Sequence, residues 1–212
     1  MINSYRDLTI EKYIELYELD IQGMEEIDIQ SNIIAILSDL TAEDVLDLPI
    51  PQYKKMAQNT AFMTTPPEVK PRKITKVTIN GKEFNVIDSV EKMTAGQYID
   101  YQTYIARKEV KMLPYILSCL IIPKGEKYGD SDTIEDLKQM SVEEALTISN
   151  FFMKQSRSLI KGTLRYLEWM MKKKMKKMKN ETMKQNLTET ITKLHSLRSS
   201  LKNGDGFPLL IQ

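Results

Sequence analysis

The sequence predicts a mainly α-helical protein with a small β-hairpin, an α+β fold, and three observations lead to this prediction. Apolar residues recur at intervals of three and four over most of the 212 residues, which is the pattern of amphipathic helices. Asn80-Gly81 separates two short runs in which apolar and polar residues alternate, the strongest short-range signal for a hairpin. A hydrophobic content of 42% and a charged content of 28% are ordinary for a folded protein.

Four segments share a helix-start pattern, in which an apolar residue precedes Thr or Ser and another apolar residue follows four positions later. The capping residues would be Thr9, Thr41, Thr94 and Ser141. In the stretch MTAGQYIDYQTYI, Thr94 would cap a helix and Gln97 would bond back to the backbone N–H of Thr94. Each cap is expected to stabilise its helix by about 1 kcal/mol. We therefore interpret this stretch, despite its tyrosines and Asp100, as a helix start and not as a functional site.

Residues 1–63 are expected to form an acidic N-terminal helical region. Helical spacing predicts short helices from Ile10 to about Leu19, from Ile29 to Leu40, from Thr41 to Leu48 and from Pro51 to about Phe62. Residues 64–73 contain three prolines and are expected to form a stiff linker.

Residues 74–140 are expected to hold the β-hairpin and the core helices. The hairpin would run from Ile74 to Ile87 around the Asn80-Gly81 turn. Because an isolated hairpin is marginally stable in water, this one should lie on helices or pair with another copy of the chain. Its exposed edge is then a place where a neighbour could add a strand.

The core helices follow the hairpin. A helix from Thr94 is expected to continue to Met112, with Pro114 kinking it or starting a new helix. The run Tyr115–Ile122 (YILSCLII) is apolar on every face and is expected to be helical, at the centre of the core. A further short helix is predicted from Ile134 to Gln139.

Residues 141–212 are expected to form a long basic C-terminal helical arm with an apolar tail. From Ser141 the helical spacing continues to about residue 202, either as one helix or as a helical hairpin that breaks near Asn180. The tail NGDGFPLLIQ ends the helix with glycines and finishes on an apolar strip. The residues expected to dock on the protein's own core or on a partner protein are Phe207, Leu209, Leu210 and Ile211.

The charges are distributed unevenly along the chain. The net charge is +1, yet residues 1–70 carry 5 basic and 13 acidic side chains, a balance of −8. Residues 151–212 carry 14 basic and 4 acidic side chains, a balance of +10. This asymmetry suggests an acidic end and a basic end with different partners, or copies that stack head to tail. The alternative is two solvated faces.

The most basic stretch is WMMKKKMKKMKN, from Trp169 to Asn180. On a helix its methionines would form one stripe and its lysines would occupy the other positions. The candidate contact residues for a partner are Lys172, Lys173, Lys174, Lys176, Lys177 and Lys179. They could contact an acidic protein, DNA phosphates or an anionic membrane, or form a solvated face whose methionine stripe packs internally. Methionine favours a protein groove over lipid, and few aromatic residues are present for stacking on bases.

No residue pattern in the sequence indicates a reaction. Cys119 is the single cysteine and lies in an apolar run, and His195 is the single histidine. The glycines do not form a phosphate-binding motif, and no set of ligands has the spacing of a metal site. The longest apolar run is too short to span a bilayer, and no secretory signal is visible. We therefore expect a cytoplasmic protein that is not an enzyme and has no cofactor, metal, small-molecule substrate or membrane contact.

The central segments INGKEFNVI, MTAGQYIDYQTY, LPYILSCLIIPKGEKYGD and FFMKQS carry a resemblance. Together they resemble small proteins from the structural modules of tailed bacteriophages, especially crAss-like phages of Bacteroidales. The N-terminal segments LTIEKYIELYELD and IIAILSDLTAEDVLDLPI resemble the opening of the same group. The resemblance covers roughly residues 8–170 and excludes the Lys- and Met-rich part of the arm.

The resemblance implies a non-enzymatic structural or assembly protein. In short-tailed phages it implies a multi-copy virion component near the portal or tail, which contacts other phage structural proteins. In long-tailed phages it implies a transient tail assembly chaperone, which is the first alternative. The second alternative, a DNA-contacting protein that uses the Lys-rich helix, comes from the residues themselves. The expected location is the virion, and the host cytoplasm during assembly.

Overall fold

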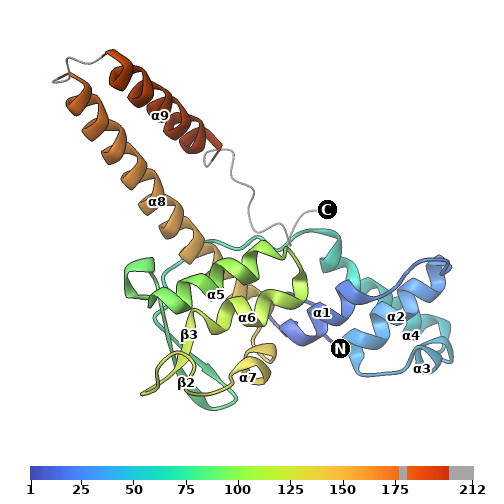
Figure 1. Cartoon of the computed structure of the whole chain (residues 1–212). Coiled ribbons are helices and arrows are strands. Elements are labelled where there is room, and N and C mark those ends of the chain that lie inside the picture. Colours follow the sequence, from blue (N-terminus) through green and yellow to red (C-terminus); the bar gives the residue numbers. More distant parts are fainter. Residues whose placement is uncertain (177–180, 201–212) are drawn as a thin grey trace.

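The computed structural model describes residues 1–176 and 181–200 of the chain. Figure 1 shows a body of short helices with a small sheet and an arm of two long helices that projects from it. The α-helices are α1 (Ile10–Glu18), α2 (Glu26–Ser38), α3 (Ala42–Leu46), α4 (Ile50–Asn59), α5 (Ala95–Ala106), α6 (Leu113–Ser118), α7 (Ile134–Lys138), α8 (Val142–Met175) and α9 (Glu181–Ser200). Single 3-10 turns are η1 (Thr60–Thr64), η2 (Val90–Lys92) and η3 (Val110–Met112). The predicted mainly α fold with a small β element is confirmed.

The four predicted helix caps are confirmed. The side-chain oxygens of Thr9, Thr41, Thr94 and Ser141 each accept a hydrogen bond from the backbone N–H three residues later. Asp44 and Gln97 bond back to the cap residue, which completes two capping boxes. These bonds satisfy backbone donors that the first turn of a helix otherwise leaves without a partner.

The predicted hairpin is confirmed, with β1 (Lys76–Ile79) and β2 (Lys82–Val86) paired antiparallel. Asn80 and Gly81 have φ angles of 50° and 79°, the left-handed values that a tight two-residue turn requires. A third strand, β3 (Ile121–Pro123), pairs antiparallel with β2, so the order is β1-β2-β3. The hairpin therefore has a third strand from its own chain, and β1 and β3 are the two edge strands of this sheet.

The strand β3 corrects the prediction for Tyr115–Ile122. That run is not one helix, because α6 ends at Ser118 and the chain then extends into Ile121 and Ile122. A short apolar run is compatible with either a buried helix or a buried strand, and periodicity alone does not separate them. Ile121 and Ile122 are β-branched, which favours a strand, and they pair with the edge of β2 that β1 leaves free.

The helix from Thr94 is also shorter than expected. It ends at Ala106 and not at Met112, because Lys108 adopts a left-handed φ of 56°. Pro114 lies in the first turn of α6, so it starts a helix and does not kink one.

The core surrounds the first turns of α8. Phe152 is fully buried and its ring meets that of Tyr101 edge-on, with centroids 5.0 Å apart. On another side of α8, Val142 and Leu146 pack with Leu8, Tyr13 and Leu37 from the N-terminal region. A backbone hydrogen bond of 2.8 Å from Val142 N to Leu8 O joins the same segments. The acidic N-terminal region, including α1 and α2, is therefore packed against the first turns of α8.

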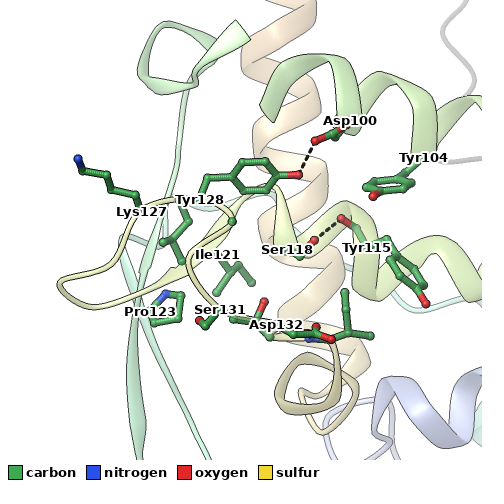
Figure 2. A pocket seen from close by; sticks show the side chains of 14 residues that line it. Asp100, Tyr104, Tyr115, Ser118, Ile121, Pro123, Lys127, Tyr128, Ser131 and Asp132 are labelled. Carbon is green, nitrogen blue, oxygen red and sulfur yellow. Dashed lines mark hydrogen bonds between the residues drawn. The ribbon is translucent and has the colours of Figure 1, made fainter. Parts of the chain in front are cut away.

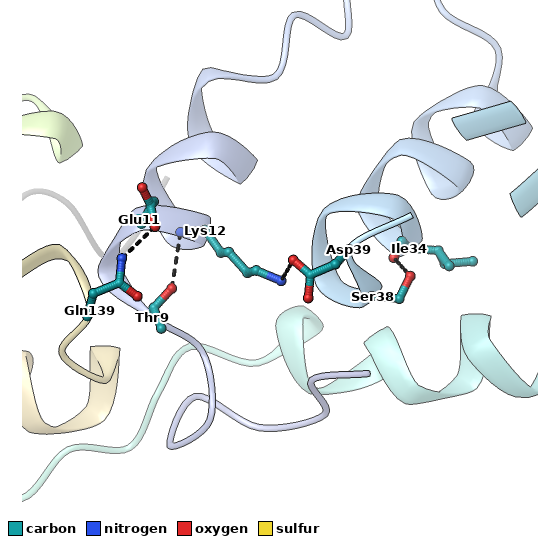
Figure 3. Close-up of polar contacts among 7 residues, drawn as sticks. All are labelled: Thr9, Glu11, Lys12, Ile34, Ser38, Asp39 and Gln139. Atoms are coloured by element: carbon teal, nitrogen blue, oxygen red, sulfur yellow. Dashed lines mark hydrogen bonds and ion pairs between the residues drawn. The ribbon is translucent and has the colours of Figure 1, made fainter. Parts of the chain in front are cut away.

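Polar contacts tie α1 to its neighbours on both sides (Figure 3). Lys12 Nζ lies 2.6 Å from Asp39 Oδ1 at the end of α2. Gln139 Nε2 donates a hydrogen bond of 2.7 Å to Glu11 Oε2, which links α1 to the end of α7. These contacts set the position of α1 between α2 and α7.

The arm is a helical hairpin in the residues described, which settles whether it is one helix or two. Helices α8 and α9 lie side by side and run in opposite directions (Figure 1). Thr188 Oγ1 on α9 donates a hydrogen bond of 3.5 Å to Met175 Sδ on α8. The apolar tail residues Phe207, Leu209, Leu210 and Ile211 lie outside the described residues.

Candidate functional site

The projecting half of α8 carries apolar residues on two opposite faces. One face holds half-buried residues, including Leu164, Leu167, Met171 and Met175, and it packs against α9. The contact of Met175 with Thr188 shows that the methionine stripe turns inward at this point. This part of the stripe therefore packs within the arm.

The opposite face of α8 is exposed, and we call it the outer arm face. It consists of Leu159, Tyr166, Trp169 and Met170, with Lys173 at its end. The spacing of three, four and seven residues places them along one side of the helix. Tyr166 and Trp169 are 60% and 56% exposed, and their ring centroids lie 6.0 Å apart. Solvent thus reaches two large aromatic rings on an arm that projects from the body.

A lysine lies directly against this aromatic pair. Lys173 Nζ is 5.0 Å from the centroid of the Trp169 ring, within the range of a cation–π contact. Gly162 lies on the same side of α8, and a Cβ there would meet no atom within 4 Å. The outer arm face therefore combines apolar surface, aromatic rings and a positive charge.

Four of the six predicted lysines are described, and all four are exposed: Lys172, Lys173, Lys174 and Lys176. Lys172 Nζ lies 3.7 Å from Glu168 Oε1. Lys174 and Lys176 make no ion pair with any residue in the described part of the chain. Lys177 and Lys179 lie outside the described residues.

Glu168 is a site residue that the sequence interpretation missed. It is buried, at 6% exposure, and His195 Nε2 on α9 lies 3.8 Å from its Oε1. A protonated His195 would form an ion pair there that joins the two helices of the arm. One signal in the sequence could have indicated it: Glu168 is the single acidic residue between Glu144 and Asn180, in a stretch that is rich in basic and apolar residues.

A second candidate is a cavity of about 410 Å³ between α5, α6, β3 and the loop that follows β3 (Figure 2). Tyr128 Oη donates a hydrogen bond of 2.8 Å to Asp100 Oδ2 on α5. The sulfur of Cys119 lies 3.6 Å from the same tyrosine oxygen. Tyr104 and Tyr115 complete the aromatic part of the lining.

The chemistry of this cavity is that of a hydrogen-bond network. Burial raises the pKa of the Cys119 thiol to about 11, so the sulfur stays protonated near neutral pH. Burial and the bond to Asp100 raise the pKa of Tyr128 above its ordinary value. Neither group is therefore an activated nucleophile. Tyr128 lies 28 positions after Asp100, which is why the sequence did not indicate the pair.

Other kinds of site can be assessed within residues 1–176 and 181–200. No group of three or more His, Cys, Asp or Glu side chains there is arranged to hold a metal ion. No helix in that part of the chain is long and apolar enough to cross a membrane. No protein-family model, curated protein or solved structure matches the chain in the comparisons.

Proposed function

We propose that this chain is a non-enzymatic structural or assembly protein of a tailed phage, present in multiple copies and acting through protein–protein contacts. The observation that carries the proposal is the outer arm face, where Tyr166 and Trp169 are exposed on a projecting helix. The phage assignment rests on the sequence resemblance over roughly residues 8–170. A virion component near the portal or tail is the form of this function that we favour.

Exposed aromatic residues support a role in binding. Trp and Tyr are enriched among the residues that contribute most to protein interfaces, because they bury a large area at a small entropic cost. Contiguous apolar surface rimmed by charges marks interaction sites on soluble proteins. On the outer arm face, Leu159 and Met170 extend the aromatic pair, and Lys173 supplies the charge.

The chemistry of the interior supports a non-enzymatic role. The single cysteine is buried and holds its proton, and the single histidine lies near a buried carboxylate on the arm. Asp100 and Tyr128 bond to each other within their cavity. These groups contribute to stability and positioning, and each has a structural explanation.

The test is to determine whether the chain is part of the mature particle. Purified phage particles are analysed by quantitative mass spectrometry, with the major capsid protein as the copy-number reference. The proposal expects the chain at a fixed number of copies per particle. Detection in infected host cells and in assembly intermediates, but not in mature particles, would identify a transient tail assembly chaperone instead.

A matched pair of variants links the particle test to the outer arm face. Trp169→Ala removes an exposed ring from this face, whereas Ile99→Ala removes a comparably exposed apolar side chain on α5. The proposal expects Trp169→Ala to lower the copy number and Ile99→Ala to leave it unchanged. Equal copy numbers for both variants and wild type would show that the outer arm face is not needed for incorporation into the particle.

A further inference from the structure

The N-terminal end of the molecule exposes a surface whose chemistry complements the arm. We call residues 18–27, from the last residue of α1 to the second residue of α2, the acidic turn. Ile21 and Ile27 are 54% and 52% exposed there, and Met24 is exposed between them. Three apolar side chains thus face solvent within seven residues of chain.

Exposed acidic residues flank and separate these apolar residues along the chain. The exposed acids of the acidic turn are Glu18, Asp20, Glu25 and Glu26. Within the described part of the chain, none of the four makes an ion pair. Glu25 precedes α2 and makes no side-chain capping bond, so its carboxylate has no structural role at this helix start. The acidic turn therefore combines exposed apolar side chains with exposed negative charges.

The acidic turn cannot meet the arm of its own chain. In Figure 1 the arm leaves the body on one side, and the α1–α2 connection lies at the opposite end, beyond α2. Arm and acidic turn are therefore free to bind two different molecules at once.

From this arrangement we infer that the outer arm face of one copy docks on the acidic turn of a second copy. Trp169, Tyr166 and Met170 would pack against Ile21, Met24 and Ile27. Lys173, Lys174 and Lys176 would face Glu18, Asp20 and Glu25. The inference deepens the proposed function, because it names the contact through which the copies assemble.

The symmetry of such a contact has a direct consequence. The two surfaces differ, so each copy offers one of each kind, and the contact is head to tail. A head-to-tail contact closes into a ring when its rotation allows and otherwise continues as an open filament. A dimer that pairs two identical surfaces is the arrangement that this contact does not produce.

A second copy fits the arm better than DNA does. Phosphate contacts require cations but do not bury Leu159, Tyr166 or Met170, which precede the lysine cluster along α8. The stripe from Leu159 to Lys173 is about 21 Å long at 1.5 Å per residue, a length that suits a protein interface with an apolar centre. Complementary charges at its rim would orient the encounter of two copies.

Charge reversal in the full-length chain tests the inference. The arm variant carries Lys173→Glu, Lys174→Glu and Lys176→Glu, and the turn variant carries Glu18→Lys, Asp20→Lys and Glu25→Lys. All six positions are exposed, and circular dichroism with thermal unfolding checks that each variant folds. Sedimentation velocity over a range of concentrations then measures self-association of wild type, of each variant and of their mixture.

The expected pattern is specific to a head-to-tail contact. Wild type self-associates, and each variant alone associates at least about tenfold more weakly, since like charges then face each other. The equimolar mixture associates again, because each reversed surface meets a complementary surface on the other variant. Trp169→Ala weakens the association of wild type by about tenfold or more, and Ile99→Ala leaves it unchanged.

Three outcomes would overturn the inference. A turn variant that self-associates as well as wild type would show that two arms pair with each other. A mixture that stays as weak as its components would show that the two surfaces do not meet. A monomeric wild type whose lysines bind duplex DNA or anionic vesicles would assign the arm to one of those partners.

The particle test and the self-association test distinguish failure of the proposed function from failure of the head-to-tail contact. Phage particles that contain the chain at fixed copy number, although it does not self-associate, would reject the head-to-tail contact and keep the proposed function. Self-association of a chain that is absent from particles and from assembly intermediates would keep the head-to-tail contact and reject the proposed function.

Discussion

Gln97 connects the start of α5 to the end of α6, because its side-chain amide bonds in two directions. Its Oε1 accepts a hydrogen bond of 3.2 Å from Thr94 N, and its Nε2 donates one of 2.8 Å to the carbonyl oxygen of Cys119. The side chain is buried, so water does not replace either partner. One residue thus completes a helix cap and satisfies a backbone carbonyl next to β3.

Gln97→Glu should destabilise the protein by about 1–3 kcal/mol, because it removes the donor to Cys119 O and leaves that carbonyl without its partner. Thr94→Ala is the matched control, since it removes only the cap and should cost about 1 kcal/mol. Urea unfolding followed by circular dichroism measures both. A Gln97→Glu variant no less stable than Thr94→Ala would contradict the importance of the bond to Cys119.

Asp88 should make the protein sensitive to acid. It is 7% exposed, and Lys73 Nζ and Lys92 Nζ lie 2.6 Å and 2.5 Å from its two carboxylate oxygens. The bond from Lys73 and then that from Lys92 lower its pKa from 3.8 to about 2. The unfolded chain therefore binds the proton more readily, so this contribution is complete above pH 4 and is lost as the pH falls towards 2.

The measurement is the free energy of unfolding from pH 6 to pH 2 for wild type and Asp88→Asn. Wild type should lose about 1 kcal/mol more than the variant over the interval from about pH 4 to pH 2, because solvent screens the exposed lysines. Parallel curves for the two proteins would show that Asp88 does not contribute.

Two glycine substitutions should have opposite effects. Gly81 has a φ of 79° in the hairpin turn, so Gly81→Ala should destabilise by about 1 kcal/mol or more. Gly162 lies within α8 with open space around a built Cβ, so Gly162→Ala should stabilise by about 0.5–1 kcal/mol. Thermal unfolding of both variants tests the signs, and a destabilising Gly162→Ala would indicate a close contact at that position.

Duplex DNA binding should depend little on salt. If the arm lysines contacted phosphates, the logarithm of affinity would fall with the logarithm of salt by about 0.9 per phosphate. We expect a flat slope, unchanged when Lys172, Lys173, Lys174 and Lys176 are replaced by Gln. A steep slope that the replacement reduces would favour the DNA-contacting alternative.

Local signals in the sequence predicted the local structure well. The four caps needed only residues within one helical turn, and Asn80-Gly81 encodes its own backbone geometry. Strand β3 was not predicted, because its identity depends on the free edge of β2, about 35 residues earlier in the chain. The end of α5 at Ala106 was also missed, because no glycine or asparagine marked Lys108 as the left-handed residue that follows it.

The candidate site was predicted in part. The lysine cluster was visible as composition, and four of its members are exposed as expected. The outer arm face was not recognised, because helical spacing alone does not show which of two apolar faces α9 covers. The arrangement of Asp100, Tyr128 and Cys119 also depends on tertiary contacts that the sequence does not display.

Helix α8 is continuous from the buried Phe152 region to the tip of the arm. At 1.5 Å per residue its 34 residues extend about 51 Å. The packing around Phe152 and Tyr101 anchors the helix in the core and sets the direction in which it projects. A tilt of about 5° at Phe152 displaces the far end of the helix, about 35 Å away, by about 3 Å. Repacking a few core side chains would thus re-aim the tip relative to the rest of the molecule.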